Sequence, residues 1–168
     1  ISTAYNSGKN AVVIAEGTYE VNFALGSHVI MKDGVSLYGG YNNTTWQRDI
    51  QNNITTIKNI SHNAQTGITS KTVHFSGLTQ NVELDGLTIL SGTDDSDENR
   101  SSAIYCENVT GQVTIQNCTI NSQGTNHYRL YGIYTYNSNV IILHNSISMG
   151  IVRNHDESLV VRNTAIYT

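Results

Sequence analysis

The chain has 168 residues, a formal net charge of −4 and only 13% charged residues. That length fits one domain with a core of its own. Lys and Arg form no cluster, so nucleic acid and anionic membrane surfaces are not expected partners. No apolar run reaches the roughly 20 residues that cross a bilayer, and no membrane span is expected. Since Pro is absent, the turns must depend on Gly, Asn and Asp.

The first residues predict a short helix. Residues 1–5 have the pattern of the end of an amphipathic helix, which Gly8 terminates. We expect residues 1–11 to cap the N-terminal end of a single domain that covers residues 1–168. Because the chain starts inside an element, without Met or a signal peptide, it is interpreted as a fragment of a longer protein.

Short apolar runs then predict strands in chain order. The early strands are expected at residues 12–14, 29–31, 35–41, 54–57 and 73–75. From residue 82 a phrase recurs in which apolar and polar residues alternate, a Gly or Asn ends the run, and another apolar residue follows. It occupies residues 82–89 and 113–120, and returns more loosely at 141–147 and 159–166. Companion strands are expected before these phrases, at 73–75, 104–106, 133–135 and 150–152.

This repeat is interpreted as one rung of a β-solenoid, because each unit must stack on its neighbours to bury its apolar face. The closing Gly or Asn lies at positions 86, 117, 145 and 163, with unequal gaps. Constant strands with variable loops are typical of a parallel β-helix, whereas a propeller or a leucine-rich horseshoe keeps a stricter period. The expected fold class is all-β: a right-handed, single-stranded parallel β-helix with a short N-terminal capping helix.

Stacked rungs place equivalent residues in columns. Two inward columns are expected, Val82, Val113, Ile141 and Leu159, and Leu84, Ile115, Leu143 and Val161. An amide ladder is expected from Asn117, Asn145 and Asn163. Cys106 and Cys118 should point inwards as buried thiols, with a disulfide as the less favoured alternative.

Three early phrases carry a resemblance to a known family. They are Val-Ile-Ala-Glu-Gly-Thr-Tyr at 13–19, Gly-Val-Ser-Leu-Tyr-Gly-Gly-Tyr at 34–41 and Trp-Gln-Arg-Asp at 46–49. With the later rungs, the chain resembles the pectate-lyase-like right-handed β-helix superfamily, and more specifically uncharacterised bacterial surface or secreted β-helix proteins. The resemblance implies a secreted or cell-envelope location and polysaccharide as the commonest ligand class, but no particular reaction. Trp46 is expected to cover the N-terminal end of the stack, with Arg48 and Asp49 fixing its loop.

The resemblance also implies that catalysis would use the outer face of the main strand stack. By strand alternation, the expected outward column there is Asp85, Gln116, His144 and Arg162, with Glu83 beside it. A Ca²⁺-assisted lyase needs several carboxylates and a basic group near one sugar. Arg162 would lie three rungs from Asp85, and the Gly-His-Gly motif of related hydrolases is absent from the sequence. A solvated face is therefore favoured; Glu83 and Asp85 are the candidate catalytic pair if the protein is an enzyme.

The densest acidic segment is the other candidate for chemistry. It contains Asp94, Asp95, Asp97 and Glu98. Alternating carboxylates can chelate Ca²⁺, but the segment lacks the spacing and the glycine of an EF-hand loop. A solvated loop is favoured over a Ca²⁺ site, so no cofactor is expected.

The strongest binding candidates are aromatic. His74, Tyr105 and Tyr134 align on the companion strand, with Tyr136 and Glu107 beside them. An exposed aromatic strip can bind sugar rings; in the favoured alternative the rings stack on one another and cover the sheet. The leading hypothesis is a non-catalytic secreted or surface module that binds glycan or host matrix. A polysaccharide lyase or hydrolase and a structural spacer of an adhesin are the alternatives.

Overall fold

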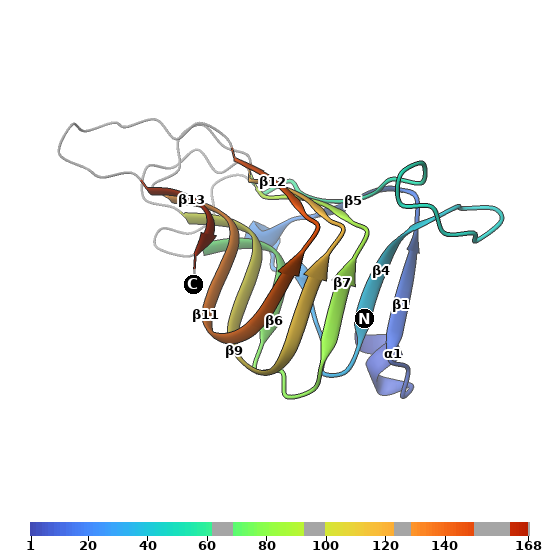
Figure 1. Cartoon of the computed structure of the whole chain (residues 1–168), viewed down its shortest axis with the longest axis horizontal. Coiled ribbons are helices and arrows are strands. Elements are labelled where there is room, and N and C mark those ends of the chain that lie inside the picture. The colour runs from blue at the N-terminus through green and yellow to red at the C-terminus, as the bar shows by residue number, and fades with distance from the viewer. Residues whose placement is uncertain (62–68, 93–99, 123–128, 150–161, 168) are drawn as a thin grey trace.

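A computed structural model describes residues 1–61, 69–92, 100–122, 129–149 and 162–167 (Figure 1). Most of these residues lie in β-strands, and a short helix precedes them. In chain order, the elements are α1 Ser2–Asn6, β1 Ala11–Ala15, β2 Gly17–Val21, the 3₁₀ turn η1 Phe23–Leu25, β3 Val29–Ile30, β4 Ser36–Tyr41, β5 Thr55–Asn59, β6 Thr69–Ser76, β7 Val82–Asp85, β8 Thr88–Leu90, β9 Arg100–Gln116, β10 Thr119–Ser122, β11 Arg129–Leu143, β12 Ser146–Met149 and β13 Arg162–Tyr167.

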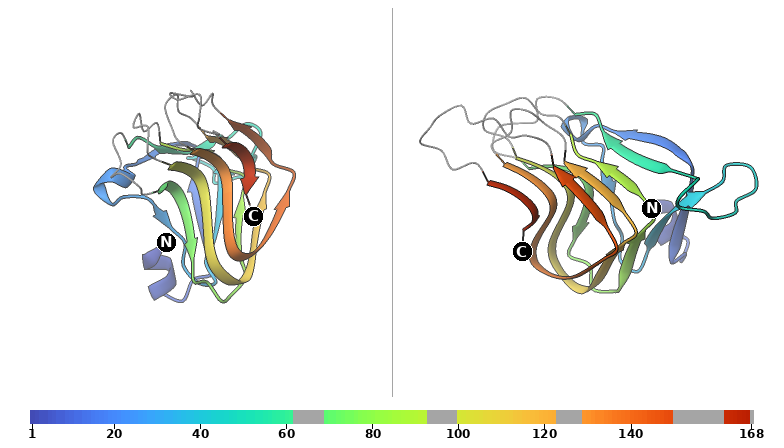
Figure 2. Two further views of the ribbon diagram at one scale, coloured as in Figure 1. Left: turned by 90° about the vertical axis from the view of Figure 1, so that its left-hand side faces the viewer. Right: turned by 45° about the horizontal axis from the view of Figure 1, so that its top comes forward.

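The strands form two parallel sheets. The larger sheet has the order β1-β4-β7-β9-β11-β13, with β6 between β3 and β9, and the smaller has the order β12-β10-β8-β5-β2. Each strand therefore pairs with a strand from the next repeat rather than with its neighbour in sequence. Figure 2 shows that the larger sheet is curled, because β9 and β11 bend along their length. The predicted all-β, parallel character is confirmed.

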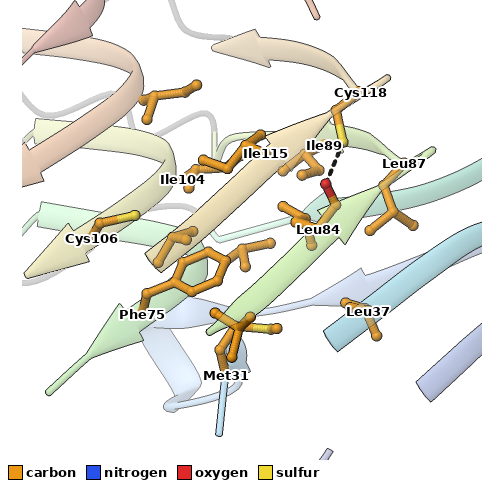
Figure 3. Packing of buried hydrophobic residues seen from close by; sticks show 14 of the residues in the cluster. Met31, Leu37, Phe75, Leu84, Leu87, Ile89, Ile104, Cys106, Ile115 and Cys118 are labelled. Atoms are coloured by element: carbon orange, nitrogen blue, oxygen red, sulfur yellow. Dashed lines mark hydrogen bonds between the residues drawn. The ribbon is translucent and has the colours of Figure 1, made fainter. Parts of the chain in front are cut away.

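The core lies between the sheets, where equivalent apolar residues stack in register. In the larger sheet Leu84 of β7 pairs with Ile115 of β9, and in the smaller sheet Ile89 of β8 pairs with Ile120 of β10. All four are completely buried. Figure 3 shows inward side chains of both sheets converging on one interior, with Phe75 and Met31 filling the space beside them. The alternation in the repeat phrase thus corresponds to alternating inward and outward side chains.

In the third repeat, the second half of β11 pairs with β9 one residue away from the predicted register. Val140 and Ile142, rather than Ile141 and Leu143, pair with Val113 and Ile115. The predicted inward positions of Ile141 and Leu143 are therefore wrong, and Leu143 is 42% exposed. The third phrase therefore spans eight residues, 140–147, like the first two. The repeats differ in length before the phrase, because β9 has two unpaired residues between Val109, which pairs with Ser138, and Gln112, which pairs with Asn139.

The corrected register also replaces the predicted amide ladder. Asn145 lies opposite Cys118 and not opposite Asn117, and its side chain accepts a hydrogen bond from the Cys118 amide at 2.8 Å. The residues that follow the paired strands are Gly86, Asn117 and His144, and all three have positive φ, at 71°, 51° and 52°. The shared feature of this corner is a left-handed backbone conformation, which Gly adopts freely and Asn or His less often.

The predicted fourth rung is placed differently. Strand β13 pairs with the beginning of β11, where Asn163 lies opposite Leu130 and Ile166 opposite Ile133. Residues 162–167 therefore form a companion strand, and the predictions that Arg162 continues the Asp85 column and Asn163 the amide ladder are wrong. Apolar alternation is common to both kinds of strand, so it could not distinguish them. Leu159, Val161 and the predicted strand at 150–152 lie outside the described residues.

The predicted N-terminal helix is confirmed. It ends at a turn in which Gly8 has a φ of 65° and donates a hydrogen bond to the Tyr5 carbonyl at 3.0 Å. Ile1 packs against the core, and Figure 1 places α1 beside β1. No helix in the described part of the chain is long and apolar enough to cross a membrane.

The loop between β4 and β5 was predicted to place Trp46 over the end of the stack and to be fixed by Arg48 and Asp49. The first prediction is wrong and the second is confirmed. Trp46 is 55% exposed at the projecting loop, so the prediction that it covers the end of the stack is wrong. Arg48 forms an antiparallel bridge with Tyr41 and donates a hydrogen bond to the Gly39 carbonyl at 2.9 Å. The Asp49 carboxylate accepts the amide hydrogens of Gln51 and Asn52. Arg48 and Asp49 therefore fix the loop, as expected.

The register predicts that Leu84 and Leu143 contribute unequally to the free energy of unfolding. Leu84→Ala should lower the free energy of unfolding by about 2–5 kcal/mol, because it leaves a cavity in a fully buried column. Leu143→Ala should change it by less than about 1 kcal/mol, because that side chain faces outwards. Chemical denaturation of both variants measures the difference. Equal losses would contradict the register of the third rung.

Candidate functional site

The outer face of the larger sheet carries two neighbouring groups of polar and aromatic side chains. The first surrounds the predicted carboxylates Glu83 and Asp85 on β7. The second is the column of rings on β6, β9 and β11. Both arise because parallel pairing puts outward residues of successive strands side by side.

Asp85 is only 5% exposed although it carries a carboxylate. Its Oδ2 lies 2.9 Å from Nη2 of Arg48, and its Oδ1 accepts a hydrogen bond from the Asn117 side chain, also at 2.9 Å. The Arg48 guanidinium lies 5.7 Å from the Tyr38 ring centre and 5.8 Å from that of Tyr41. Because a buried charge requires such compensation, Asp85 anchors the loop that carries Arg48 to the sheet.

Glu83 is also engaged. Its Oε2 accepts a hydrogen bond from the Tyr38 hydroxyl at 2.7 Å, and its Oε1 accepts one from the Gln116 side chain. Burial, followed by the hydrogen bond to Glu83, raises the pKa of Tyr38 above its ordinary value. Tyr38 is therefore a neutral donor at physiological pH, and both oxygens of the Glu83 carboxylate are engaged by neighbouring side chains.

The predicted catalytic column is only partly assembled. Asp85 and Gln116 lie side by side in register. The next position is occupied by Leu143, since His144 lies in the turn. General acid–base chemistry needs a carboxylate that can reach substrate, whereas both carboxylates here are bound by neighbouring side chains. Sequence reasoning missed Arg48 as the partner of Asp85, because no repeat pattern relates the loop to β7.

The predicted aromatic column is present. His74, Tyr105 and Tyr134 lie in one register row. The rings of Tyr105 and Tyr134 stack at 4.7 Å with an interplanar angle of 11°, and His74 meets Tyr105 edge-on at 5.6 Å. Tyr131 packs against Tyr134 at 5.2 Å. These rings pack on one another, face to face between Tyr105 and Tyr134 and edge-on elsewhere, which matches the interpretation that they cover the sheet.

The column has a charged flank. Nε2 of His74 lies 2.8 Å from Oε1 of Glu107, and the Lys71 ammonium lies 4.3 Å from the Tyr105 ring centre. Burial and then the Lys71 charge lower the pKa of His74, and Glu107 opposes that effect. The imidazole is therefore neutral at pH 7, and its contact with Glu107 is a hydrogen bond rather than an ion pair. Tyr136, opposite Glu107 in register, is 60% exposed and the most accessible of the predicted binding residues.

Two further rings extend the column, which sequence analysis did not find. His28 packs against Phe23 at 5.1 Å and against His74 at 5.7 Å. Both ring nitrogens of His28 are buried without a hydrogen-bond partner among the described residues. Burial, then His74 and Lys71, lower the pKa of His28. The repeat offered no signal for His28, because it precedes a two-residue strand outside the phrase.

The predicted metal loop with Asp94, Asp95, Asp97 and Glu98 lies outside the described residues. Within the described ranges, no three His, Cys, Asp or Glu side chains are grouped to hold a metal ion. Cys106 and Cys118 are free and buried, as predicted. The Cys118 thiol points towards the Leu84 carbonyl at 3.7 Å (Figure 3).

The Arg48–Asp85 pair predicts a strong effect on stability. Arg48→Met should lower the free energy of unfolding by about 2 kcal/mol, because Asp85 then stays buried without its counter-charge. The double variant Arg48→Met/Asp85→Asn should recover part of that loss, since the uncompensated charge is gone. Denaturation curves measure both, with Lys9→Met as a control at an exposed cation. Equal stability of the three variants would contradict a structural role for the pair.

The thiols predict low reactivity. Burial raises the pKa of Cys118 to about 12 and raises that of Cys106 as well. Because the thiolate is the reactive species, both cysteines should resist an aromatic disulfide reagent in the native protein at pH 8. Both should react within minutes in denaturant. Rapid labelling of the native protein would contradict the buried placement.

No protein-family model matches this chain, and no curated protein or solved structure resembles it significantly. Neither the superfamily nor an activity therefore follows from a relative. What the outer face can do is inferred from its own geometry.

Proposed function

We propose that the two sheets are two faces of a right-handed parallel β-solenoid of the pectate-lyase-like type, in which each turn contributes a strand to both sheets. The support is the pairing pattern, in which β7, β9 and β11 are neighbours in one sheet and β8, β10 and β12 are neighbours in the other. One pass through both sheets accounts for each repeat of the sequence phrase. A solenoid of this type presents a long outer face on which equivalent side chains form rows.

We further propose that the protein is a non-catalytic, secreted or cell-surface module that binds glycan or host matrix molecules. The observation that carries this proposal is the row of aromatic and charged side chains on the outer face, where Tyr136 is exposed beside Glu107. Tyrosine combines an apolar ring with a hydroxyl, a combination suited to sugars. The row runs across successive strands, so it fits an extended polymer better than a small molecule.

The catalytic alternative has weaker support. Its candidates, Glu83 and Asp85, are engaged by Tyr38 and Gln116 and by Arg48 and Asn117. A lyase or hydrolase would have to break these contacts before either carboxylate reached a sugar. Binding through Tyr136 requires no such rearrangement, because that side chain is already exposed.

The proposal predicts retention without cleavage. The chain should be retained by one or more members of a panel of acidic and neutral polysaccharides, with and without Ca²⁺, and the polymers should keep their length. Tyr136→Ala should weaken that binding about fivefold, because an exposed aromatic contact of this kind is worth about 1 kcal/mol. Affinity electrophoresis measures retention, and chromatography of the polymer measures cleavage.

A matched control is Tyr19→Ala, which removes a tyrosine of similar exposure, 43%, from β2 in the other sheet. It should leave binding unchanged. Tyr105→Phe and Tyr134→Phe keep the stacked rings and test only the hydroxyl groups. Cleavage of any polymer would favour the enzyme, and equal losses in Tyr136→Ala and Tyr19→Ala would refute the aromatic row as the binding surface.

A further inference from the structure

Residues 22–30 form a short arm that lies against the edge of β6. The arm begins after β2 and contains η1 and β3. Strand β3 has two register pairs with β6, Val29 with Val73 and Ile30 with His74. Residues 24–27, which precede β3, are exposed, and Gly26 turns the chain with a φ of 77°. The backbone thus attaches this arm weakly, and side chains must contribute much of its stability.

Two side chains attach the arm to the rest of the protein: Val29 packs against the core, and the His28 ring packs against the His74 ring. The His28 ring lies between Phe23 and His74, with centres 5.1 and 5.7 Å away. Both of its nitrogens are shielded from water and have no partner among the described residues. A neutral imidazole tolerates this position at a modest cost, but a charged imidazole without a partner does not.

The surrounding charges oppose protonation of this stack. On β6, the Lys71 ammonium is close enough to act on both His28 and His74. On β9, Glu107 is the carboxylate that faces the stack, and it contacts His74. Ile1 and Ser2, at the start of α1, line a cleft of about 300 Å³ together with His28. In the described part of the chain, two imidazolium ions and one ammonium would therefore face one carboxylate, that of Glu107.

We propose that residues 22–30 are an acid-released latch, in which protonation of His28 and His74 separates this arm from β6. Val21 and Met31 remain the hinges, because Val21 is held in β2 and Met31 is buried in the core. Release uncovers Val29 and the hydrogen-bonding edge of β6. This inference is independent of glycan binding and holds whether or not the outer face binds a polymer.

The direction of the pH effect follows from the lowered pKa values. In the closed state both imidazoles have a pKa below the ordinary 6.5, so the released state takes up protons more readily. The closed state is fully stable above pH 6.5 and loses stability as the pH falls below that value, until the closed-state groups are themselves protonated. The relevant window therefore begins just below pH 6.5.

The test is hydrogen exchange of the native chain at pH 7.5 and pH 5.0, with protection factors corrected for the intrinsic effect of pH. The peptide covering residues 22–31 should lose protection at pH 5.0, because the released state takes up protons more readily than the closed state. Peptides from β9 and β10 should keep theirs. His28→Phe preserves the ring stack without a titrating group, and should abolish most of the loss.

His144→Asn is the matched control, because it removes an imidazole from an exposed turn whose positive φ Asn tolerates. It should respond to pH as the native chain does. Unchanged protection of residues 22–31 in the native chain, an unchanged pH response in His28→Phe, or equal loss across β9 and β10 would each overturn the latch. Glycan retention measured at pH 7.5 is a separate readout, so failure of the binding proposal leaves this result intact.

Discussion

Parallel pairing between equivalent strands of successive repeats is the constraint on which the rest of the structure depends. Each strand places its inward residue directly against the corresponding residue of the next strand, as Leu84 does against Ile115. Identical backbone spacing then forces like side chains into contact, inside as apolar columns and outside as rows. The outer face therefore inherits its pattern from the requirements of the core, and any site on it extends along the stack.

That constraint explains why the carboxylates of β7 serve structure. Asp85 points outwards by alternation, yet the loop between β4 and β5 folds over it, and its two oxygens contact Arg48 and Asn117. The same residues hold the projecting loop to the sheet. An outward carboxylate that becomes buried in this way has lost the access to substrate that catalysis requires.

The aromatic row follows from the same register. Stacked strands bring His74, Tyr105 and Tyr134 to ring-contact distance, with Tyr105 and Tyr134 face to face and His74 edge-on to Tyr105. His28 joins this row from a different element, and its unpaired nitrogens make the junction sensitive to charge. Binding at Tyr136 and release at His28 would thus be two uses of one surface, one near each side of the row.

The apolar alternation by itself determined most of the strands, their parallel stacking and most core residues, because burial on a pleated strand imposes a period of two. It did not predict β2 at residues 17–21. It also determined the aromatic row, since the companion strands align without gaps. The register of the third rung depended on two extra residues in β9. The place of β13 in the sheet depended on its pairing with the first half of β11 rather than the second. Sequence phrases cannot resolve these choices, because a shift of one residue still matches an apolar run such as 140–143. Only the tertiary structure decided that Asp85 is buried against Arg48 and that His28 lies on His74, because those contacts join segments that no repeat relates.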